Sequence, residues 1–349
     1  MTGAFGMMAI ARVRPLVLAL ALVAGAVLPA GAQRFVLGGS ATVYNLAGEV
    51  TVAPGTGSQV VVEVTRAGDD AWQLRVNHSG GTLRVVFPGE RVVYARMGRN
   101  SRTQLRVASD GSFGGGLRSR QVTVAGSGRG TRAWADVRVL VPAGRSVSVH
   151  QGVGRVSVTN VDGRVQVHGS SASVATSGTR GGLQLNTGSG SIQVRGAQGD
   201  VTADAGSGSV SVDGVRGSRV QVETGSGRVT ATNLRAETVA VDVGSGAVSL
   251  SGIQARDVSV ETGSGSVQLA MASDAQRVSV DTGSGSVTLG LPASFGAELY
   301  VDTGSGGINV QVPVTNRRSS RSRLEGRIGD GNGRVEIDTG SGGVRIHRN

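Results

Sequence analysis

Acidic and histidine side chains recur at one fixed position of a repeated sequence phrase, and side chains of these types can bind cations. The phrase is most cleanly written Asp281-Thr282-Gly283-Ser284-Gly285-Ser286-Val287, and it returns ten times between residues 150 and 342. Its first glycine, replaced by serine at position 170, is taken as position 0 of each repeat. We call the residues at position −2 the polar column: His150, His168, Asn186, Asp204, Glu223, Asp242, Glu261, Asp281, Asp302 and Asp338.

Cation binding is the chemistry that this column suggests first. Stacked carboxylates repel one another by about 1 kcal/mol even in water, and oxygen-rich stacks can be relieved by Ca²⁺. Two imidazoles one repeat apart could contribute to a transition-metal site. If a cation binds, its candidate ligands are His150, His168, Asp204, Glu223, Asp242, Glu261, Asp281 and Asp302.

A straight column does not converge on one point, and the Gly-Gly-x-Gly-x-Asp calcium repeat is absent from the sequence. We therefore expect no metal site. Instead, we expect carboxylates that are solvated beside arginines, or that accept hydrogen bonds from the neighbouring Gly-Ser-Gly amides. For the two histidines, stacked surface imidazoles are the expected arrangement.

Motifs for catalysis or cofactor binding are also missing from the sequence. The Gly-Ser-Gly phrase lacks the lysine of a phosphate-binding loop, and no helix pattern follows it. Histidine occurs only four times, and none of the four lies in a nucleophile elbow. We expect no catalytic residues and no cofactor.

The spacing of the phrase predicts the fold. Successive repeats are 18 to 21 residues apart, except for one final step of 36 residues, and a fixed period of this kind indicates stacked units. Position +4 is valine or isoleucine in all ten repeats, and position −5 is valine or leucine. Polar residues alternate with these positions, so each repeat holds two half-buried strands. We predict an all-β, single-chain β-solenoid with coils of about 18–21 residues, wound in the right-handed sense.

The Gly-Ser-Gly phrase is expected to turn the chain at the same corner of every coil. Glycine reaches positive φ without a Cβ clash, and small residues allow successive corners to stack closely. Each coil is expected to stack on the one before it in the sequence. The long last step is attributed to a loop insertion at 313–334, which leaves the solenoid before the final coil.

Positive charge is unevenly spread along the chain. The formal net charge is +11, and all basic residues apart from histidine are arginines. Residues 66–145 hold 14 Arg against 5 acids, whereas residues 150–310 hold 10 Arg against 13 acids. The segment 88–132 interrupts the strand pattern, and we interpret it as a protruding hairpin or loop that binds anions. Its candidate residues are Arg96, Arg99, Arg102 and Arg106; a solvated loop without a ligand is the alternative.

The first 32 residues have the pattern of a secretory signal. Arg12 and Arg14 precede an apolar run, which ends at Pro29-Ala30-Gly31-Ala32, a cleavage sequence. A buried N-terminal helix is the alternative. We expect the segments to be a signal peptide at 1–32, irregular β coils at 33–148 with the insert 88–132, and regular repeats at 149–349. The expected location is exported, meaning periplasmic, cell-surface or secreted, with no transmembrane segment after cleavage.

A family resemblance rests on Val141-Pro142-Ala143-Gly144, the reiterated Thr-Gly-Ser-Gly, Gly329-Asp330-Gly331 and the last phrase at 338–342. Over residues 40–349 the chain resembles the bacterial "putative adhesin" β-strand-repeat proteins. These are envelope proteins of unknown function with toastrack or head-GIN-like β-solenoid domains. The resemblance implies the architecture and brings no catalytic residues, and the insert 88–132 has no counterpart in its pattern.

The functional expectation is an exported, non-enzymatic adhesin or interaction module of the cell envelope. Its expected partner is an anionic envelope polymer or another envelope protein; few aromatic residues accompany the arginines, so no nucleic acid is expected. Two alternatives remain. One is a polysaccharide-acting β-helix enzyme, and the other is a structural element that self-associates end to end.

Overall fold

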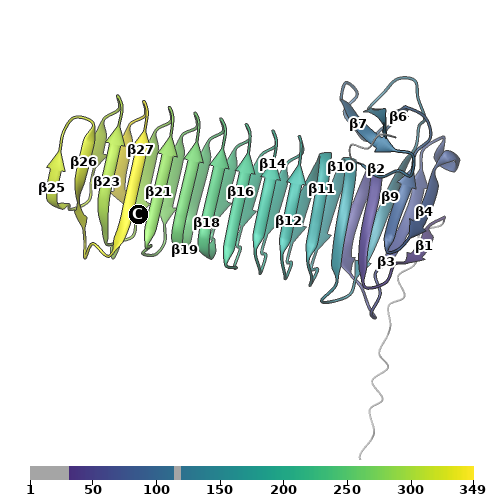
Figure 1. Ribbon diagram of the computed structural model, residues 1–349, viewed down its shortest axis with the longest axis horizontal. Coiled ribbons are helices and arrows are strands. Elements are labelled where there is room, and N and C mark those ends of the chain that lie inside the picture. The colour runs from purple at the N-terminus through teal and green to yellow at the C-terminus, as the bar shows by residue number, and fades with distance from the viewer. Residues whose placement is uncertain (1–30, 114–118) are drawn as a thin grey trace, which may run out of the picture. The chain divides into compact units, whose positions relative to one another are not determined.

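The coils of this chain form one long, mostly parallel β-solenoid (Figure 1). The structure, a computed structural model, describes residues 31–113 and 119–349. Most of the expected signal peptide therefore lies outside the described residues, and it remains a prediction. Within the described residues no helix is long and apolar enough to cross a membrane.

The described residues up to 145 form nine strands and a single 3-10 turn at Ala71–Gln73. These strands are β1 (Gln33–Val36), β2 (Ser40–Pro54), β3 (Val61–Ala67), β4 (Arg75–Ser79), β5 (Thr82–Val86), β6 (Arg91–Val93), β7 (Arg102–Ala108), β8 (Ser119–Ala125) and β9 (Trp134–Val141).

The repeats form the remaining strands. They are β10 (Ser146–Thr159), β11 (Val165–Ser177), β12 (Leu183–Thr187), β13 (Ile192–Arg195), β14 (Val201–Ala205), β15 (Val210–Asp213), β16 (Arg219–Thr224), β17 (Val229–Thr232), β18 (Arg235–Val243), β19 (Val248–Thr262), β20 (Val267–Met271), β21 (Arg277–Thr282), β22 (Val287–Leu291), β23 (Ala297–Thr303), β24 (Ile308–Val310), β25 (Thr315–Ser319), β26 (Arg323–Ile328), β27 (Gly333–Thr339) and β28 (Val344–Arg348).

The predicted apolar columns form the core. Neighbouring coils pair in parallel register, so Val165 lies beside Val147 and Leu183 beside Val165. Every residue at position −5 is buried, and so is every residue at position +4 except Ile308, which belongs to an outer coil. Stiff β-branched side chains stacked in this way fill a narrow core without large aromatic residues. The β-solenoid prediction is confirmed.

Close stacking, not positive φ, explains the glycines of the Gly-Ser-Gly corner. None of these corner glycines between Gly188 and Gly342 has φ in the left-handed region. A Cβ on Gly265 would overlap the carbonyl oxygen of Gly246 in the adjacent coil, and the same overlap recurs from coil to coil. The expectation of positive φ at this corner was therefore wrong. The left-handed column lies at the opposite corner, and its members are Asn160, Gly178, Gly196, Gly214, Asn233 and Gly252.

Buried threonines at position −1 hold the Gly-Ser-Gly corner. The Thr282 hydroxyl accepts a hydrogen bond from the Gly285 amide at 3.0 Å and donates one to the Gly265 carbonyl at 3.2 Å. Thr224 makes the corresponding pair of bonds with Gly227 and Gly208. Thr282 and Thr224 thus each join their own corner to the neighbouring coil, which satisfies backbone groups that would otherwise be buried without partners.

The last coil is not at the end of the stack. Strand β27 pairs in parallel with both β21 and β23, and β28 pairs with both β22 and β24. The final coil therefore lies between the two coils that precede it in the sequence, contrary to the expected sequential order. The insertion 313–334 forms most of an antiparallel extension, in which β26 pairs with β23 and β25 with β26.

The N-terminal end of the described chain is interleaved in a similar way. Strand β2 pairs with β10 on one side and with β9 and β5 on the other. Antiparallel strands then cover this end, because β3 pairs with β9 and β1 with β3. Antiparallel strands therefore lie beyond the parallel coils at both ends of the described solenoid.

Segment 88–132 contains a small three-stranded sheet, where a hairpin or loop was expected. Strand β8 pairs with β6 in parallel and with β7 in antiparallel fashion. Val92, Val122 and Val124 are buried, so the sheet has an apolar side. It lies beside the first coils, at the edge where the Gly-Ser-Gly corners stack (Figure 1). We call strands β6–β8 and their connections the small sheet.

Replacing Gly265 with alanine should destabilise the solenoid by about 1–3 kcal/mol or more, because the added methyl group overlaps the adjacent backbone. The exposed neighbour Ser264 provides a matched control, and Ser264→Ala should change stability by less than about 0.5 kcal/mol. Chemical denaturation of both variants measures the difference. Equal stability of the two variants would show that the corners can separate without cost.

Candidate functional site

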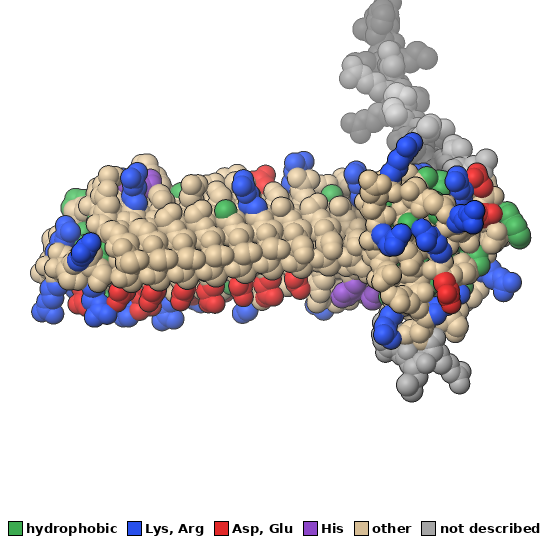
Figure 2. Space-filling view, turned by 90° about the horizontal axis from the view of Figure 1, so that it is seen from above, with side chains coloured by type: hydrophobic (Ala, Val, Ile, Leu, Met, Phe, Trp, Pro, Cys, Tyr) green, Lys and Arg blue, Asp and Glu red, His purple; other side chains and the backbone are tan. Residues whose placement is uncertain are grey.

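The polar column is a continuous line of side chains in the structure. Parallel pairing places each member directly beside the next, and Asp338 lies between Asp281 and Asp302 because of the interleaved last coil. Tyr44 precedes His150 at one end, and Arg323 follows Asp302 at the other. Figure 2 shows the acidic side chains in a row along one side of the coils, next to the histidines.

Mutual repulsion and partial burial affect the carboxylates of this line. The pKa of Asp338 is raised, first by partial burial and then by the charges of Asp281 and Asp302. The pKa of Asp204 is raised by partial burial and by Glu223. At the C-terminal end, the Arg323 guanidinium relieves the repulsion by pairing with Asp302 at 2.6 Å.

The expected hydrogen bonds from corner amides to these carboxylates are not found among the described residues. The second glycine amide of the corner binds the threonine at position −1, as Gly285 binds Thr282, and other corner amides bind carbonyls of the adjacent coil, as Ser207 binds Gly188. The carboxylates are consequently left to solvent and to occasional side-chain partners, such as Gln221, which donates to Glu223 at 2.6 Å.

A metal centre would need side chains that converge. Among residues 31–113 and 119–349, no three His, Asp or Glu side chains are grouped to hold a metal ion. The candidates His150 and His168 project side by side from adjacent strands and do not converge on a common point, since their rings stack face to face at 4.8 Å. The column therefore remains a charged surface feature.

The two histidines belong to a stack of rings. Tyr44 lies parallel to His150 at 4.2 Å, and the Arg84 guanidinium lies 5.6 Å from the centre of the Tyr44 ring. Burial lowers the pKa of His150 to about 4, with a further contribution from the charge of His168. Burial also lowers the pKa of His168. Both imidazoles are therefore neutral at pH 7, which removes the repulsion that two charged rings would feel.

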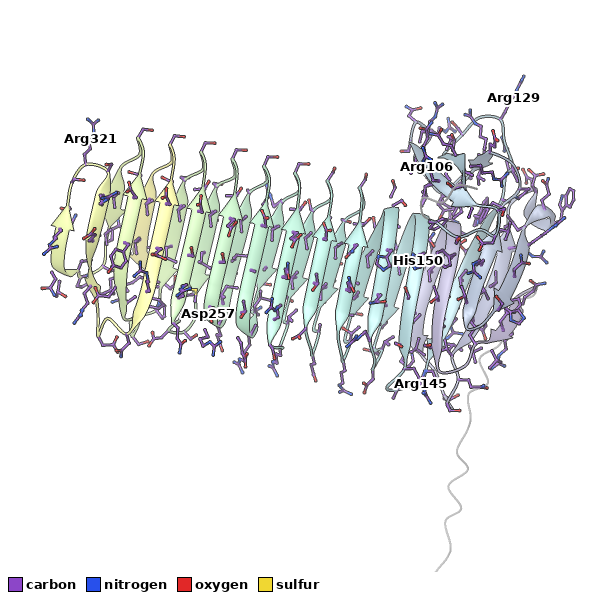
Figure 3. The ribbon with its side chains drawn as sticks, in the orientation of Figure 1. Arg106, Arg129, Arg145, His150, Asp257 and Arg321 are labelled. Carbon is purple, nitrogen blue, oxygen red and sulfur yellow. The ribbon has the colours of Figure 1, made fainter. Side chains whose placement is uncertain are left out.

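The structure separates the four predicted anion-binding arginines into two kinds. Arg96 pairs with Asp136 at 3.0 Å and with Glu49 at 3.7 Å, and it lies over the Trp134 ring. Because both acids lie on solenoid strands, Arg96 attaches the small sheet to the coils. Elsewhere on the small sheet, Arg99, Arg102 and Arg106 are exposed and make no ion pair with any described residue. Figure 3 shows Arg106 on this sheet, away from His150.

A groove of about 520 Å³ lies where the small sheet meets strands β10 and β11. Arg102 lines it from the small sheet, and Arg155 lines it from the first regular coil. A hydrogen bond of 3.0 Å from Thr103 to Ser171 joins its two sides. Sequence reasoning missed Arg155, although there was a signal: in position +3, where serine is common, Arg155 and Arg228 are the charged members.

A second hollow, of about 360 Å³, lies near the C-terminal end of the polar column. Asp281, Asp302, Asp338 and Arg323 line it together with Tyr300. The Arg334 guanidinium lies 4.4 Å from the centre of the Tyr300 ring. Glu325 and Glu336 line it as well, so five acidic residues, an arginine and an aromatic ring meet on one open surface.

Comparison with known proteins identifies a family with this architecture. A family model described as Toastrack DUF4097 matches residues 42–347. A crystal structure of a "putative cell adhesion protein" from Clostridium sporogenes is similar at 10% identity, covering 91% of this chain and 99% of that chain. Its TM-score is 0.19, which is too low to support an inference about this chain. No curated protein matches the chain.

Acidification should destabilise the protein through His150. Its pKa is near 6.5 when unfolded and about 4 when folded, so the unfolded chain binds the extra proton between these values. The stabilisation is complete above pH 6.5 and is lost as the pH falls toward 4. Since the ring is partly exposed, we expect a loss of about 1–2 kcal/mol.

Denaturant titrations at pH 7 and pH 5 test this expectation, with His150→Gln as the comparison. The raised pKa values of Asp204 and Asp338 act in the opposite direction, and they do so in both proteins. The lowered pKa of His168 acts in the same direction as that of His150, and His168 is also present in both proteins. The difference between the proteins therefore reports the contribution of the His150 imidazole. An equal response of wild type and variant to acid would contradict the assignment to His150.

Proposed function

Because the chain belongs to the Toastrack DUF4097 family, we propose that it is an exported, non-enzymatic interaction module of the bacterial cell envelope. Export rests on the signal-like sequence of residues 1–32. The observation that carries the binding role is the set of exposed, unpaired guanidinium groups on the small sheet, Arg99, Arg102 and Arg106. They stand beside repeats in which, over residues 150–310, 13 acids outnumber 10 arginines.

The partner that this charge distribution favours is an anionic envelope polymer. Guanidinium groups bind carboxylate, sulfate and phosphate oxygens with two parallel hydrogen bonds. The polar column carries negative charge along the same coils and would repel such a polymer. Contact should therefore concentrate at the small sheet, which holds the polymer at one end of the solenoid.

Binding of an anionic polysaccharide should weaken steeply as salt increases, because contacts between exposed charges are screened over about 8 Å at physiological ionic strength. The triple variant Arg99→Ser, Arg102→Ser and Arg106→Ser should abolish binding and leave the melting temperature unchanged. Arg96 is retained in this variant because it attaches the small sheet to Asp136 and Glu49.

The matched control replaces the same three arginines with lysine, which keeps the charge. Binding isotherms at low and high salt compare the three proteins. Polysaccharide binding that persists at high salt and in the serine variant would refute a role for the small sheet.

One observation favours a second candidate function, a polysaccharide-acting enzyme. The hollow near the C-terminal end combines Asp281, Asp302, Asp338, Arg323 and Tyr300, which are residue types found at sugar-cleaving sites. Arg323 is, however, already paired with Asp302. Partial burial, followed by repulsion from Asp281 and Asp302, accounts for the raised pKa of Asp338 without a catalytic role.

We expect no turnover when the purified protein is incubated with a panel of acidic and neutral polysaccharides. Reducing ends and unsaturated products are the measured quantities. Turnover that disappears in Asp338→Asn and persists in Asp242→Asn, a variant of the same column outside the hollow, would establish the enzyme and overturn the proposed function.

The structure gives little support to the third alternative, end-to-end association. Strand β25, which lies beyond β26 at the C-terminal end, is exposed along its whole length and carries Arg317 and Arg318. Charged residues on an outer strand oppose pairing with another copy. At the other end, β3 pairs in antiparallel fashion with β9, and β1 pairs in antiparallel fashion with β3. The charges of β25 are thus the feature that opposes association at the C-terminal end.

A further inference from the structure

The groove between the small sheet and the first coils brings together two arginines that are 53 positions apart in the sequence, since Arg102 and Arg155 both line it. Arg102 begins strand β7, and Arg155 lies in the middle of β10. Both side chains are exposed, and neither makes an ion pair with any described residue. Two unpaired cations that face one hollow repel each other unless an anion lies between them.

Arg96, the third arginine of the groove, keeps the small sheet against the coils even though Arg102 and Arg155 repel each other. Arg96 is compensated by Asp136 and Glu49, and its pairing with these solenoid acids fixes the small sheet over the coils. The contact between Thr103 and Ser171 adds a second point of attachment. Glu49 lines the groove and lies beside Arg155 in the register of β2 and β10, but its ion pair is with Arg96. Arg102 and Arg155 make no ion pair with a described residue, so their charges remain available.

Hydroxyl groups supply much of the remaining groove surface, which also includes Glu49, Met97 and Val153. Ser101, Thr103, Ser171, Ser173 and Ser189 line it together with the arginines. Ser189 also begins a row of exposed serines that leads away from the groove along the corner edge. In spatial order these serines are Ser189, Ser207, Ser226, Ser245, Ser264, Ser284, Ser341 and Ser305.

We propose that this groove is a binding site for an acidic polysaccharide. A carboxylate or sulfate of the chain lies between Arg102 and Arg155, and sugar hydroxyls bind the serine and threonine hydroxyls beside it. The following sugars extend along the corner edge of the solenoid. This inference rests on the proposed function, and it adds a defined site and a ligand class.

The shape of the site favours a polysaccharide over a phospholipid surface. Arg155 lies on a solenoid strand, at the side of the groove opposite the small sheet. The headgroups of a flat bilayer would reach the outer arginines before they reached a residue in this position. An extended sugar chain can enter an open groove from its end, and it matches the many hydroxyl groups.

Arg155→Ser tests the site because Arg155 lies outside the small sheet. The probe is a galacturonate hexasaccharide, and its affinity is measured by calorimetry at low salt. Loss of one charge-assisted contact should weaken binding about tenfold. Arg228 occupies the same position in a later coil and is also exposed and unpaired, so Arg228→Ser is the matched control and should change affinity less than about twofold. Arg155→Lys should retain part of the affinity, and Arg102→Ser should resemble Arg155→Ser.

The possible outcomes separate this inference from the proposed function. If the triple variant of the small sheet loses binding but Arg155→Ser behaves as wild type, the groove is refuted and the proposed function stands. If wild type binds neither the hexasaccharide nor longer acidic polysaccharides, both fail. Stronger binding to phosphatidylglycerol vesicles or to inorganic phosphate than to the sugar would also overturn the assignment. Unchanged melting temperatures of the variants show that any loss of affinity is local.

Discussion

The in-register stacking of one coil upon the next is the constraint on which the rest of this structure depends. Parallel pairing places each residue directly beside the same position of the adjacent coil. The residue at each position must therefore pack against the residue at the same position of the adjacent coil. Inside, this requirement selects valine and related residues, whose branched side chains stack well. At the Gly-Ser-Gly corner it selects glycine, because the adjacent backbone leaves no room for a Cβ.

On the outer surface, the same constraint places side chains of like charge beside one another. A carboxylate at position −2 in one coil lies beside another carboxylate in the next, from Asp204 to Asp302. Partial burial and then repulsion from these neighbours raise the pKa of Asp204 and of Asp338. Where the column contains rings instead, stacking holds Tyr44, His150 and His168 together. On a surface of this kind, each coil presents similar side chains at the same place. A localised site must therefore arise where the repetition is interrupted, as it is at the small sheet.

The features that follow from repetition could be predicted from the sequence, and those that follow from its interruption could not. The alternation of Val165 and Val167 with polar neighbours was enough to predict the strands and the buried columns. The order of the last coils was not predictable, because all coils present similar columns and β27 can pair with either β21 or β23. The role of Thr282 was hidden because the same position is Ala205 or Val243 in other repeats.

The candidate site shows the same limit. The composition of 88–132 indicated an arginine-rich surface, yet composition does not reveal pairing. Arg96 proved to be an attachment point because Asp136 and Glu49, far away in the sequence, lie beside it in space. In the sequence, Arg155 is one polar residue among many in the repeats, and only the structure places the small sheet opposite it.

The interleaved last coil also changes how the solenoid responds to force. In a stack built in sequence order, the final coil has a neighbour on one side only, and a pull on the C-terminus would peel the coils away one at a time. Here β27 and β28 are hydrogen-bonded on both sides. Extraction of this coil must break two ladders together and leaves a gap between two other coils. The coil formed by β27 and β28 is thus clamped by its neighbours on both sides.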